Sequence, residues 1–298
     1  MMHTVTVTGA TGNVGKELAL ELLARDVKVR AIGRSVERLR ALTEKGAEAW
    51  VGSMEDEAFL TKALTGAGAA FVMIPPNFAA PDFRAYQRGL VATIGRALEK
   101  AGVTHVVSLS SIGADLPAGT GPIAGLYDLE QRLNAIADLN AIHLRAAYFM
   151  ENNLNSIGLI KGQGLNGSPL RADLALPMIA TRDIAAVAAE LLAAPTFTGK
   201  SARELLGPRD YTPAEVTSVL GRAIGKPDLA YLAFPYPEAR KAMVGMGFSE
   251  PLADVFLEMQ KAMNDGRVGA REKRSATNQT PTTLEDFAKT FAAAYNAS

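Results

Sequence analysis

A glycine-rich turn within the first fifteen residues constrains this chain more than any other feature. Residues 5–7 are an apolar run typical of a buried strand, residues 14–23 have apolar positions at helical spacing, and Gly9, Gly12 and Gly15 stand around the junction. In a strand–turn–helix setting, such glycines permit a tight turn, close approach of a pyrophosphate, and close packing of helix on strand. The helix N-terminus adds free N–H groups and partial positive charge. The residues expected to bind phosphate are Gly9, Thr11, Gly12, Asn13, Val14 and Gly15.

Apolar runs and helical patterns then alternate through the first half of the chain. Strands are expected at 5–7, 27–32, 49–51, 69–74, 103–109 and 141–144, and helices at 14–23, 36–42, 59–64 and 83–98. Such alternation predicts an α/β fold, a Rossmann-type doubly wound parallel sheet buried on both faces. We assign residues 1–147 to this dinucleotide-binding domain.

The second half has no repeating strand–helix pattern. Residues 161–169 are Gly-rich and polar and predict an irregular segment. Asp183 is expected to cap a helix over 184–192, and Thr212 to cap another that opens on Pro213, with Glu215 at the capping-box position. Further helices are expected at 238–246, 251–263 and 284–295. We therefore expect 148–298 to be a smaller, mostly helical substrate-binding region, packed on the carboxyl edge of the sheet.

The end of the second predicted strand indicates which dinucleotide is preferred. Domains that prefer NAD carry an acid here to bind the ribose 2′-hydroxyl, but residues 30–35 contain none. Arg34 can bind a 2′-phosphate bidentately, Ser35 can add a hydroxyl, and Arg38 lies one turn later. The alternative is a solvated basic helix start. We expect NADP(H) to be preferred, with NAD(H) as the other option.

Two further segments follow predicted strands at the same edge of the sheet. Pro75 and Pro76 are expected to form a rigid cofactor wall, and the neighbouring Asn77 and Phe78 to line the substrate pocket. After the sixth strand, Tyr148 and Phe149 are expected beside the nicotinamide and Met150 in the substrate pocket, with core packing as the alternative. The residues of these two segments are Pro75, Pro76, Asn77, Phe78, Tyr148, Phe149 and Met150. Aromatic walls suit flat substrates.

Composition excludes several other classes of protein. Positive and negative residues number 31 each, so no net charge favours nucleic acid or an anionic membrane as a partner. The chain has no cysteine, and its three histidines show no ligand spacing, so no metal site is expected. We see no signal peptide and no apolar run of membrane-spanning length, which predicts a cytoplasmic protein.

Several motifs resemble those of the NmrA-like atypical short-chain dehydrogenases, and the resemblance spans nearly the whole chain. The matching segments are 7–15, 29–34, 101–103, 109–114, 144–153, 181–185, 207–208 and 211–212. Within that family the chain looks most similar to NAD(P)H:quinone oxidoreductases and triphenylmethane-dye reductases. The resemblance implies an NAD(P)H-dependent oxidoreductase that transfers hydride to quinones or similar flat conjugated acceptors, without flavin. The family also includes NmrA, so a non-catalytic NAD(P)-sensing regulator is the alternative.

The expected catalytic residues depart from the family's patterns. Typical short-chain dehydrogenases use Tyr-x-x-x-Lys, but here Tyr127 is followed by Gln131. In the NmrA-like pattern, His or Lys usually precedes Glu by four residues, and Tyr127 and Gln131 take those two positions. Tyr127 is therefore a candidate hydrogen-bond donor to substrate or a packing residue. Ser110 and Ser111 are candidates to orient substrate, or they bond locally at the strand end. The substrate's identity and a homodimer are left open.

Overall fold

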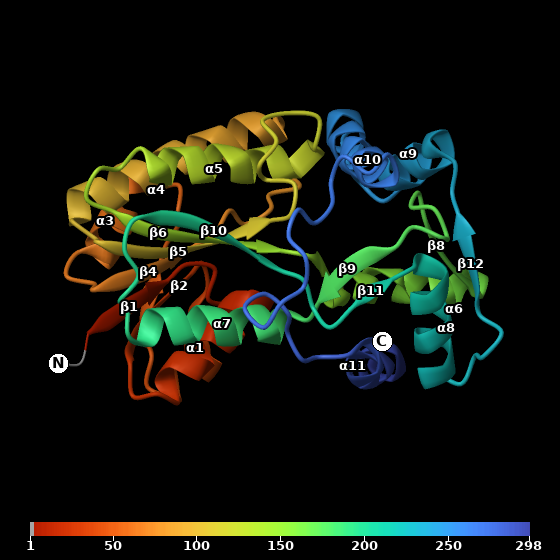
Figure 1. Ribbon diagram of the computed structural model, residues 1–298, viewed down its shortest axis with the longest axis horizontal. Helices are drawn as coiled ribbons and strands as arrows, with labels where there is room; N and C mark the ends of the chain where they lie inside the picture. The colour runs from red at the N-terminus through yellow and green to blue at the C-terminus, as the bar shows by residue number, and fades with distance from the viewer. Residues whose placement is uncertain (1–2) are drawn as a thin grey trace. The chain divides into compact units, whose positions relative to one another are not determined.

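The computed structural model describes residues 3–298 and confirms the predicted α/β fold. Its main feature is a seven-stranded sheet with the order β10-β6-β5-β4-β1-β2-β3, drawn in Figure 1. The neighbouring pairs β3–β2, β2–β1, β1–β4 and β4–β5 are parallel. Strands 3-2-1-4-5-6 follow the Rossmann order, and the order reverses between β1 and β4, which is where such sheets bind dinucleotides.

The chain forms two compact units, and the first contains most of this sheet. Unit 1 comprises residues up to Pro117, Ala124–Arg145 and Thr181–Arg203. Its strands are β1 Thr4–Val7, β2 Lys28–Gly33, β3 Glu48–Val51, β4 Ala69–Val72, β5 His105–Ser111, β6 Asn140–Ala146 and the start of β10 Lys200–Leu205. Its helices are α1 Asn13–Leu23, α2 Val36–Thr43, α3 Glu57–Leu64, α4 Phe83–Ala101, α5 Ala124–Asn134 and α7 Thr181–Ala193.

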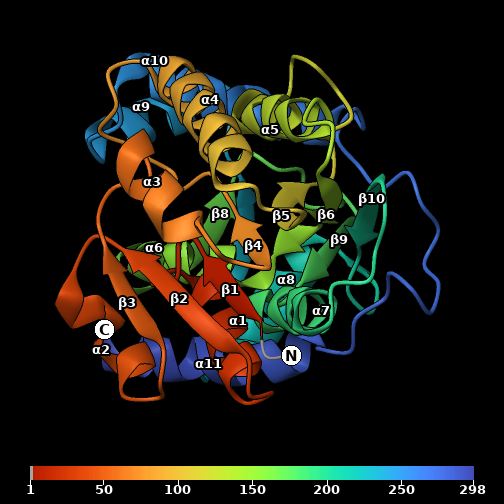
Figure 2. The same cartoon turned by 90° about the vertical axis from the view of Figure 1, so that its left-hand side faces the viewer.

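The helices of unit 1 cover both faces of the sheet. Helices α3, α4 and α5 lie on one face, while α1 and α7 lie side by side on the other (Figures 1 and 2). The sheet and the first of these layers enclose a core of fully buried aliphatic residues that includes Leu64, Ile94 and Leu129. Burying both faces leaves the strand ends and their loops as the accessible part of the sheet.

Local sequence explains where several of these helices begin and end. Ser35, Asp56 and Asp82 are the N-caps of α2, α3 and α4, and each side chain accepts a hydrogen bond from a backbone N–H of the first turn. Gly102 ends α4 at φ 67°, in the left-handed region that glycine enters without a steric penalty. The caps place α2, α3 and α4 so that their N-termini follow the carboxyl ends of β2, β3 and β4.

Unit 2 comprises Ala118–Ile123, Ala146–Ala180 and Glu204–Ser298. It contains one sheet with the order β11-β9-β7 and another formed by β12 and β8. Its strands are β7 Tyr148–Phe149, β8 Leu165–Ser168, β9 Leu176–Ile179, β11 Asp210–Tyr211 and β12 Ala230–Ala233. Its helices are η1 Gly121–Ile123, η2 Met150–Ser156, α6 Ile157–Gln163, α8 Pro213–Ala223, α9 Tyr236–Gly245, α10 Glu250–Asn264 and α11 Leu284–Ala297. The assignment of substrate binding to 148–298 stays a prediction.

The helices predicted for the second half are confirmed as α7, α8, α9, α10 and α11, but two other predictions there are wrong. The segment 161–169 is not irregular, because α6 ends at Gln163, Gly164 is its C-cap, and the next residues form β8, which pairs in parallel with β12. Asp183 does not cap its helix, since α7 begins at Thr181 and Asp183 lies in its first turn. Thr212 does cap α8, accepting from the Glu215 N–H. Short strands that pair only with distant segments leave little periodic signal in the sequence.

Candidate active site

The glycine loop lies between β1 and α1, at the reversal point of the sheet. The Gly12 N–H donates to the Gly9 carbonyl at 2.9 Å, which closes a tight turn. Gly9 has φ 63°, a conformation that favours glycine. A Cβ on Gly15 would lie 2.2 Å from the Gly9 oxygen, so only glycine lets α1 start this close to the loop. Two of the three glycines are therefore required by the fold itself.

Gly12 is different, because space is open beside it. A Cβ there would meet the Gly9 oxygen at 3.4 Å, an ordinary contact, and no other heavy atom of the described chain within 4 Å. Gly12 is also the N-cap of α1, and no side chain caps that helix or adds an acid to its first turn. Its first N–H groups, including those of Asn13 and Val14, thus point to a partner outside the protein. This exposed, uncapped turn fits the pyrophosphate of a dinucleotide.

The end of β2 presents two exposed arginines. Arg34 follows Gly33 directly, Arg38 lies in the first turn of α2, and the guanidinium of neither has a hydrogen-bond or ion-pair partner among residues 3–298. Ser35 accepts from the Arg38 N–H at 3.2 Å and donates to Glu37 at 2.6 Å. That hydroxyl holds the pKa of the Glu37 carboxylate below its usual range. The cluster combines two unpaired cations with one nearby acid, a charge pattern that suits a phosphate.

Tyr86 was not anticipated from the sequence, yet it supports this edge of the sheet. Its hydroxyl donates to the Pro75 carbonyl at 2.9 Å and so anchors the segment that follows β4. Burial raises the pKa of Tyr86; the charge of Glu55 also raises it, and Arg34 lowers it. A tyrosine one turn into a helix gives no sequence signal for this role. These interactions show that Arg34 and the Pro75 segment both lie close to Tyr86.

The segment after β4 is irregular and partly accessible, as expected for a wall. Pro75 is half-buried and Pro76 is exposed. Asn77 caps its own turn, accepting from the Ala79 N–H at 3.3 Å. Phe78 is 47% exposed, which is unusual for an aromatic side chain in a unit with a large core. The structure thus leaves Phe78 accessible to a ligand.

Ser110 and Ser111, both at the end of β5, have different surroundings. Ser110 is 3% exposed and donates to Glu130 Oε1 at 2.5 Å. Glu130 is also buried and accepts two further bonds from Arg145, at 3.0 and 2.6 Å. The Ser110 hydroxyl is thus engaged inside the protein, whereas Ser111 is partly accessible and donates only to the Ile112 carbonyl at 2.9 Å. Of the two serines, Ser111 is better placed to meet a substrate.

Glu130 changes the interpretation of the α5 motif. The sequence comparison placed Gln131 at the family's Glu position, and Gln131 is exposed. Glu130, one residue earlier, is the buried carboxylate. Tyr127 is half-buried on the same helix, and its hydroxyl has no hydrogen-bond partner within residues 3–298. The helix thus offers one accessible phenol above one buried acid, and the catalytic role of Tyr127 stays a prediction.

A second buried polar group lies beside the first and was also missed. His143 Nδ1 is 2.7 Å from the Ser108 hydroxyl, and its Nε2 is 3.0 Å from Asn134 Oδ1. Ser108 is completely buried, so this arrangement cannot act as a nucleophile on a substrate. Burial lowers the pKa of His143; Glu130 raises it and Arg145 lowers it. His143 is therefore a structural histidine whose neutral form is favoured.

Tyr148, Phe149 and Met150 belong to unit 2. Tyr148 and Phe149 form β7, which pairs in parallel with Met178 and Ile179 of β9. Burial raises the pKa of Tyr148 to about 12, the nearby Tyr231 adds to that rise, and Asn152 opposes it. Met150 is completely buried in the core of unit 2 and can support a pocket wall only from behind. The roles predicted for these three residues stay predictions.

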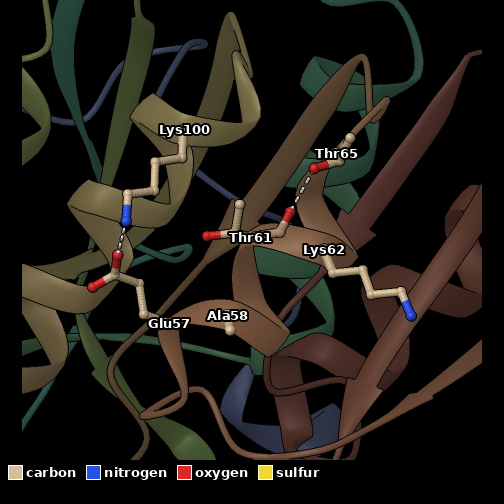
Figure 3. A pocket seen from close by; sticks show the side chains of 6 residues that line it. All are labelled: Glu57, Ala58, Thr61, Lys62, Thr65 and Lys100. Carbon is tan, nitrogen blue, oxygen red and sulfur yellow. Dashed lines mark hydrogen bonds and ion pairs between the residues drawn. The ribbon is translucent and has the colours of Figure 1, made fainter.

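The hollow between α3 and α4 is not the candidate site. It has a volume of about 610 Å³ and is lined by Glu57, Ala58, Thr61, Lys62, Thr65 and Lys100 (Figure 3). Lys100 donates to Glu57 at 2.5 Å, and Lys62 points away from that pair in Figure 3. These helices cover the face of the sheet opposite α1. The carboxylate that lines this hollow is already paired with Arg96 and Lys100, and we favour the glycine loop.

Two absences hold for residues 3–298. No group of three or more His, Asp or Glu side chains is placed to hold a metal ion. No helix there is both long and apolar enough to cross a membrane.

Comparisons with known proteins agree with this architecture. The NAD(P)H azoreductase of Xenophilus azovorans is 31% identical over 98% of this chain and 99% of its own. The Escherichia coli NADPH-dependent quinone oxidoreductase, solved with NADPH, superposes with a TM-score of 0.78 at 23% identity, covering 96% and 99% of the two chains. The Citrobacter triphenylmethane reductase, solved with NADP(H), gives 0.77 at 21% identity, covering 97% and 99%. Residues 1–288 match the model of the NmrA-like family. This chain belongs to the NmrA-like family.

Proposed function

We propose that this chain is an NAD(P)H-dependent reductase that transfers hydride to quinones, azo dyes or similar flat conjugated acceptors, with NADPH preferred. The observation that carries the proposal is the uncapped N-terminus of α1 at Gly12, where open space meets free N–H groups. The similarity to an NAD(P)H azoreductase along almost the entire chain supports the same class of reaction.

The residues at this edge have separate tasks in binding the cofactor. The N–H groups of Asn13 and Val14 would bind the pyrophosphate, and Arg34 and Arg38 would bind the 2′-phosphate. Because both guanidiniums are unpaired among the described residues, neither must break an ion pair first. When bound, the reduced nicotinamide supplies the hydride. Tyr86 holds the Pro75 segment in place and thereby stiffens the wall of the site.

The acceptor needs less help from acid catalysis than a simple ketone does. An acceptor such as a quinone takes up a hydride and a proton and leaves as the hydroquinone, and the oxidised dinucleotide is the other product. The negative charge that forms is delocalised over the conjugated ring, and water can supply the proton. Tyr127 and Ser111 then only need to donate hydrogen bonds to the acceptor's oxygen or nitrogen. This explains how the site tolerates Gln131 in place of Lys.

A screen of NADPH oxidation tests the proposal. Purified protein without added flavin is mixed with NADPH and with quinones, azo dyes, triphenylmethane dyes or enones, and absorbance at the reduced-nicotinamide band is followed. We expect turnover with at least one class of flat acceptor and a lower KM for NADPH than for NADH. Tight NADPH binding without oxidation by any acceptor would instead support a dinucleotide-sensing regulator. Absence of dinucleotide binding would refute both.

A further inference from the structure

Polar side chains of unit 1 form two hydrogen-bonded tiers that connect α5 to β5 and β6. The lower tier consists of Ser108, His143 and Asn134, and the upper tier of Ser110, Arg145 and Glu130. Each tier takes one residue from β5, one from β6 and one from α5. The strand residues are two apart, so they point to the same side of the sheet, and the helix residues are four apart, so they share one face of α5. The tiers therefore stack.

The tiers run toward the carboxyl edge of the sheet. Successive tiers are separated by two strand residues, about 6.6 Å. Helix α5 runs the opposite way, so its earlier residues lie nearer that edge. Tyr127 precedes Glu130 by three positions and Asn134 by seven, which puts all three on one face of the helix. Tyr127 thus occupies the next level of the stack.

The third level differs from the two below it. The side chains within each tier are hydrogen-bonded to one another, although Asn134 of the lower tier is exposed and Arg145 of the upper tier is partly accessible. The Tyr127 hydroxyl has no such partner among residues 3–298, and its side chain is partly accessible. The levels are also close enough to interact, because Glu130 and Arg145 of the upper tier shift the pKa of His143 in opposite directions.

We propose that Glu130 is a positioning residue that sets where the Tyr127 hydroxyl stands. Glu130 receives three hydrogen bonds from β5 and β6, and it lies one helical turn below Tyr127. Fixing that turn against both strands fixes the phenol at the carboxyl edge of the sheet. Ser110 is accordingly part of the hydrogen-bonded support for α5 and not a substrate-orienting serine. This inference rests on the proposed function for its kinetic consequences.

A double-mutant cycle tests whether Glu130 acts through Tyr127. Glu130→Gln keeps the shape of the side chain but removes its charge, and Ser110→Ala removes one hydrogen bond without touching the ion pair. We expect each to lower kcat for the acceptor by up to the effect of Tyr127→Phe, about threefold to tenfold. The dissociation constant for NADPH should not change. In a Tyr127→Phe background, Glu130→Gln should cost nothing further, whereas independent effects that multiply would overturn the proposal.

The lower tier supplies a matched control. His143→Gln changes a side chain of β6 that is as buried as Ser110 and Glu130, and it should lower the melting temperature while leaving kcat unchanged. If His143→Gln and Ser110→Ala lower kcat equally, the upper tier has only a structural role.

A readout independent of turnover is the ¹⁹F spectrum of protein containing 3-fluorotyrosine, with the Tyr127 signal assigned by Tyr127→Phe. Ser110→Ala should shift or broaden that signal, and His143→Gln should leave it in place. An unmoved signal in both Ser110→Ala and Glu130→Gln would refute the proposal whether or not the protein reduces any acceptor. If the wild type oxidises no NADPH with any acceptor while the ¹⁹F shifts are as expected, only the proposed function is refuted.

Discussion

Gly12→Val should separate cofactor binding from folding. Gly12 has φ −90°, which valine adopts without strain, and a Cβ there makes a single contact of 3.4 Å. We therefore expect the free energy of unfolding to change by less than about 1 kcal/mol, as at other open surface positions. The added methyl groups would instead occupy the space beside the α1 N–H groups. Excluding the pyrophosphate should weaken NADPH binding at least about 100-fold, or about 2.7 kcal/mol.

Calorimetric titration with NADPH and a thermal melt of the unliganded protein measure the two quantities. Gly15→Ala is the control on the same loop, because its Cβ would lie 2.2 Å from the Gly9 oxygen. That variant should lose stability by about 1–3 kcal/mol as the helix and loop move apart. If Gly12→Val binds NADPH within threefold of the wild type, the loop is only a turn, and the assignment of the phosphate site is wrong.

Three further predictions concern separate parts of the protein. Arg34→Ala should weaken NADPH binding about tenfold to 100-fold, by loss of charged hydrogen bonds, and leave NADH binding unchanged; equal losses for both cofactors in a titration would contradict a 2′-phosphate role. Tyr127→Phe should slow acceptor reduction about threefold to tenfold, and a thousandfold loss in kcat would make Tyr127 a general acid. Because burial lowers the pKa of His143 in the folded state, the unfolded chain binds the proton first as pH falls below 6.5. Stability should therefore decrease below that pH, and melting curves of His143→Gln should show a smaller decrease than the wild type.

The fold of the first half could be predicted from sequence because its signals are local. Six strands and the first four helices between them lie within a few residues of the predicted bounds, whereas α5, between β5 and β6, was not predicted. The glycine turn requires its glycines for reasons that a sequence displays. The strands of unit 2 could not be predicted in this way. β8 pairs with β12, more than sixty residues later, and β7 has only two residues. Pairing between distant short segments depends on the complete fold, so a short stretch of sequence does not show a periodic pattern that predicts it.

The candidate site shows the same division between local and distant signals. The sequence indicated Gly12 and Arg34 because both follow strands at fixed distances along the chain. It also selected Ser110 and Ser111 as equivalent candidates, since the pleat that separates them cannot be seen in residue types. Only the structure shows that Ser110 faces the buried Glu130 while Ser111 lies toward the accessible side. A one-residue shift along a strand reverses the side chain's direction, so equal sequence signals can lead to opposite roles.

The polar tiers bear on why the chain can depart from the Tyr-x-x-x-Lys pattern of typical short-chain dehydrogenases without disturbing the fold. A lysine four residues after Tyr127 would have to act from position 131, which is exposed. The residue that faces the strands is Glu130, and its carboxylate is already neutralised by Arg145 and bonded to Ser110. Breaking a buried pair by removing one partner typically costs about 3–5 kcal/mol, whereas changing the exposed Gln131 costs little. Folding therefore depends strongly on Glu130 and weakly on the residue at position 131. A reductase whose acceptor delocalises the negative charge does not need this lysine. The chain combines the absence of that lysine with an intact upper tier of Ser110, Arg145 and Glu130.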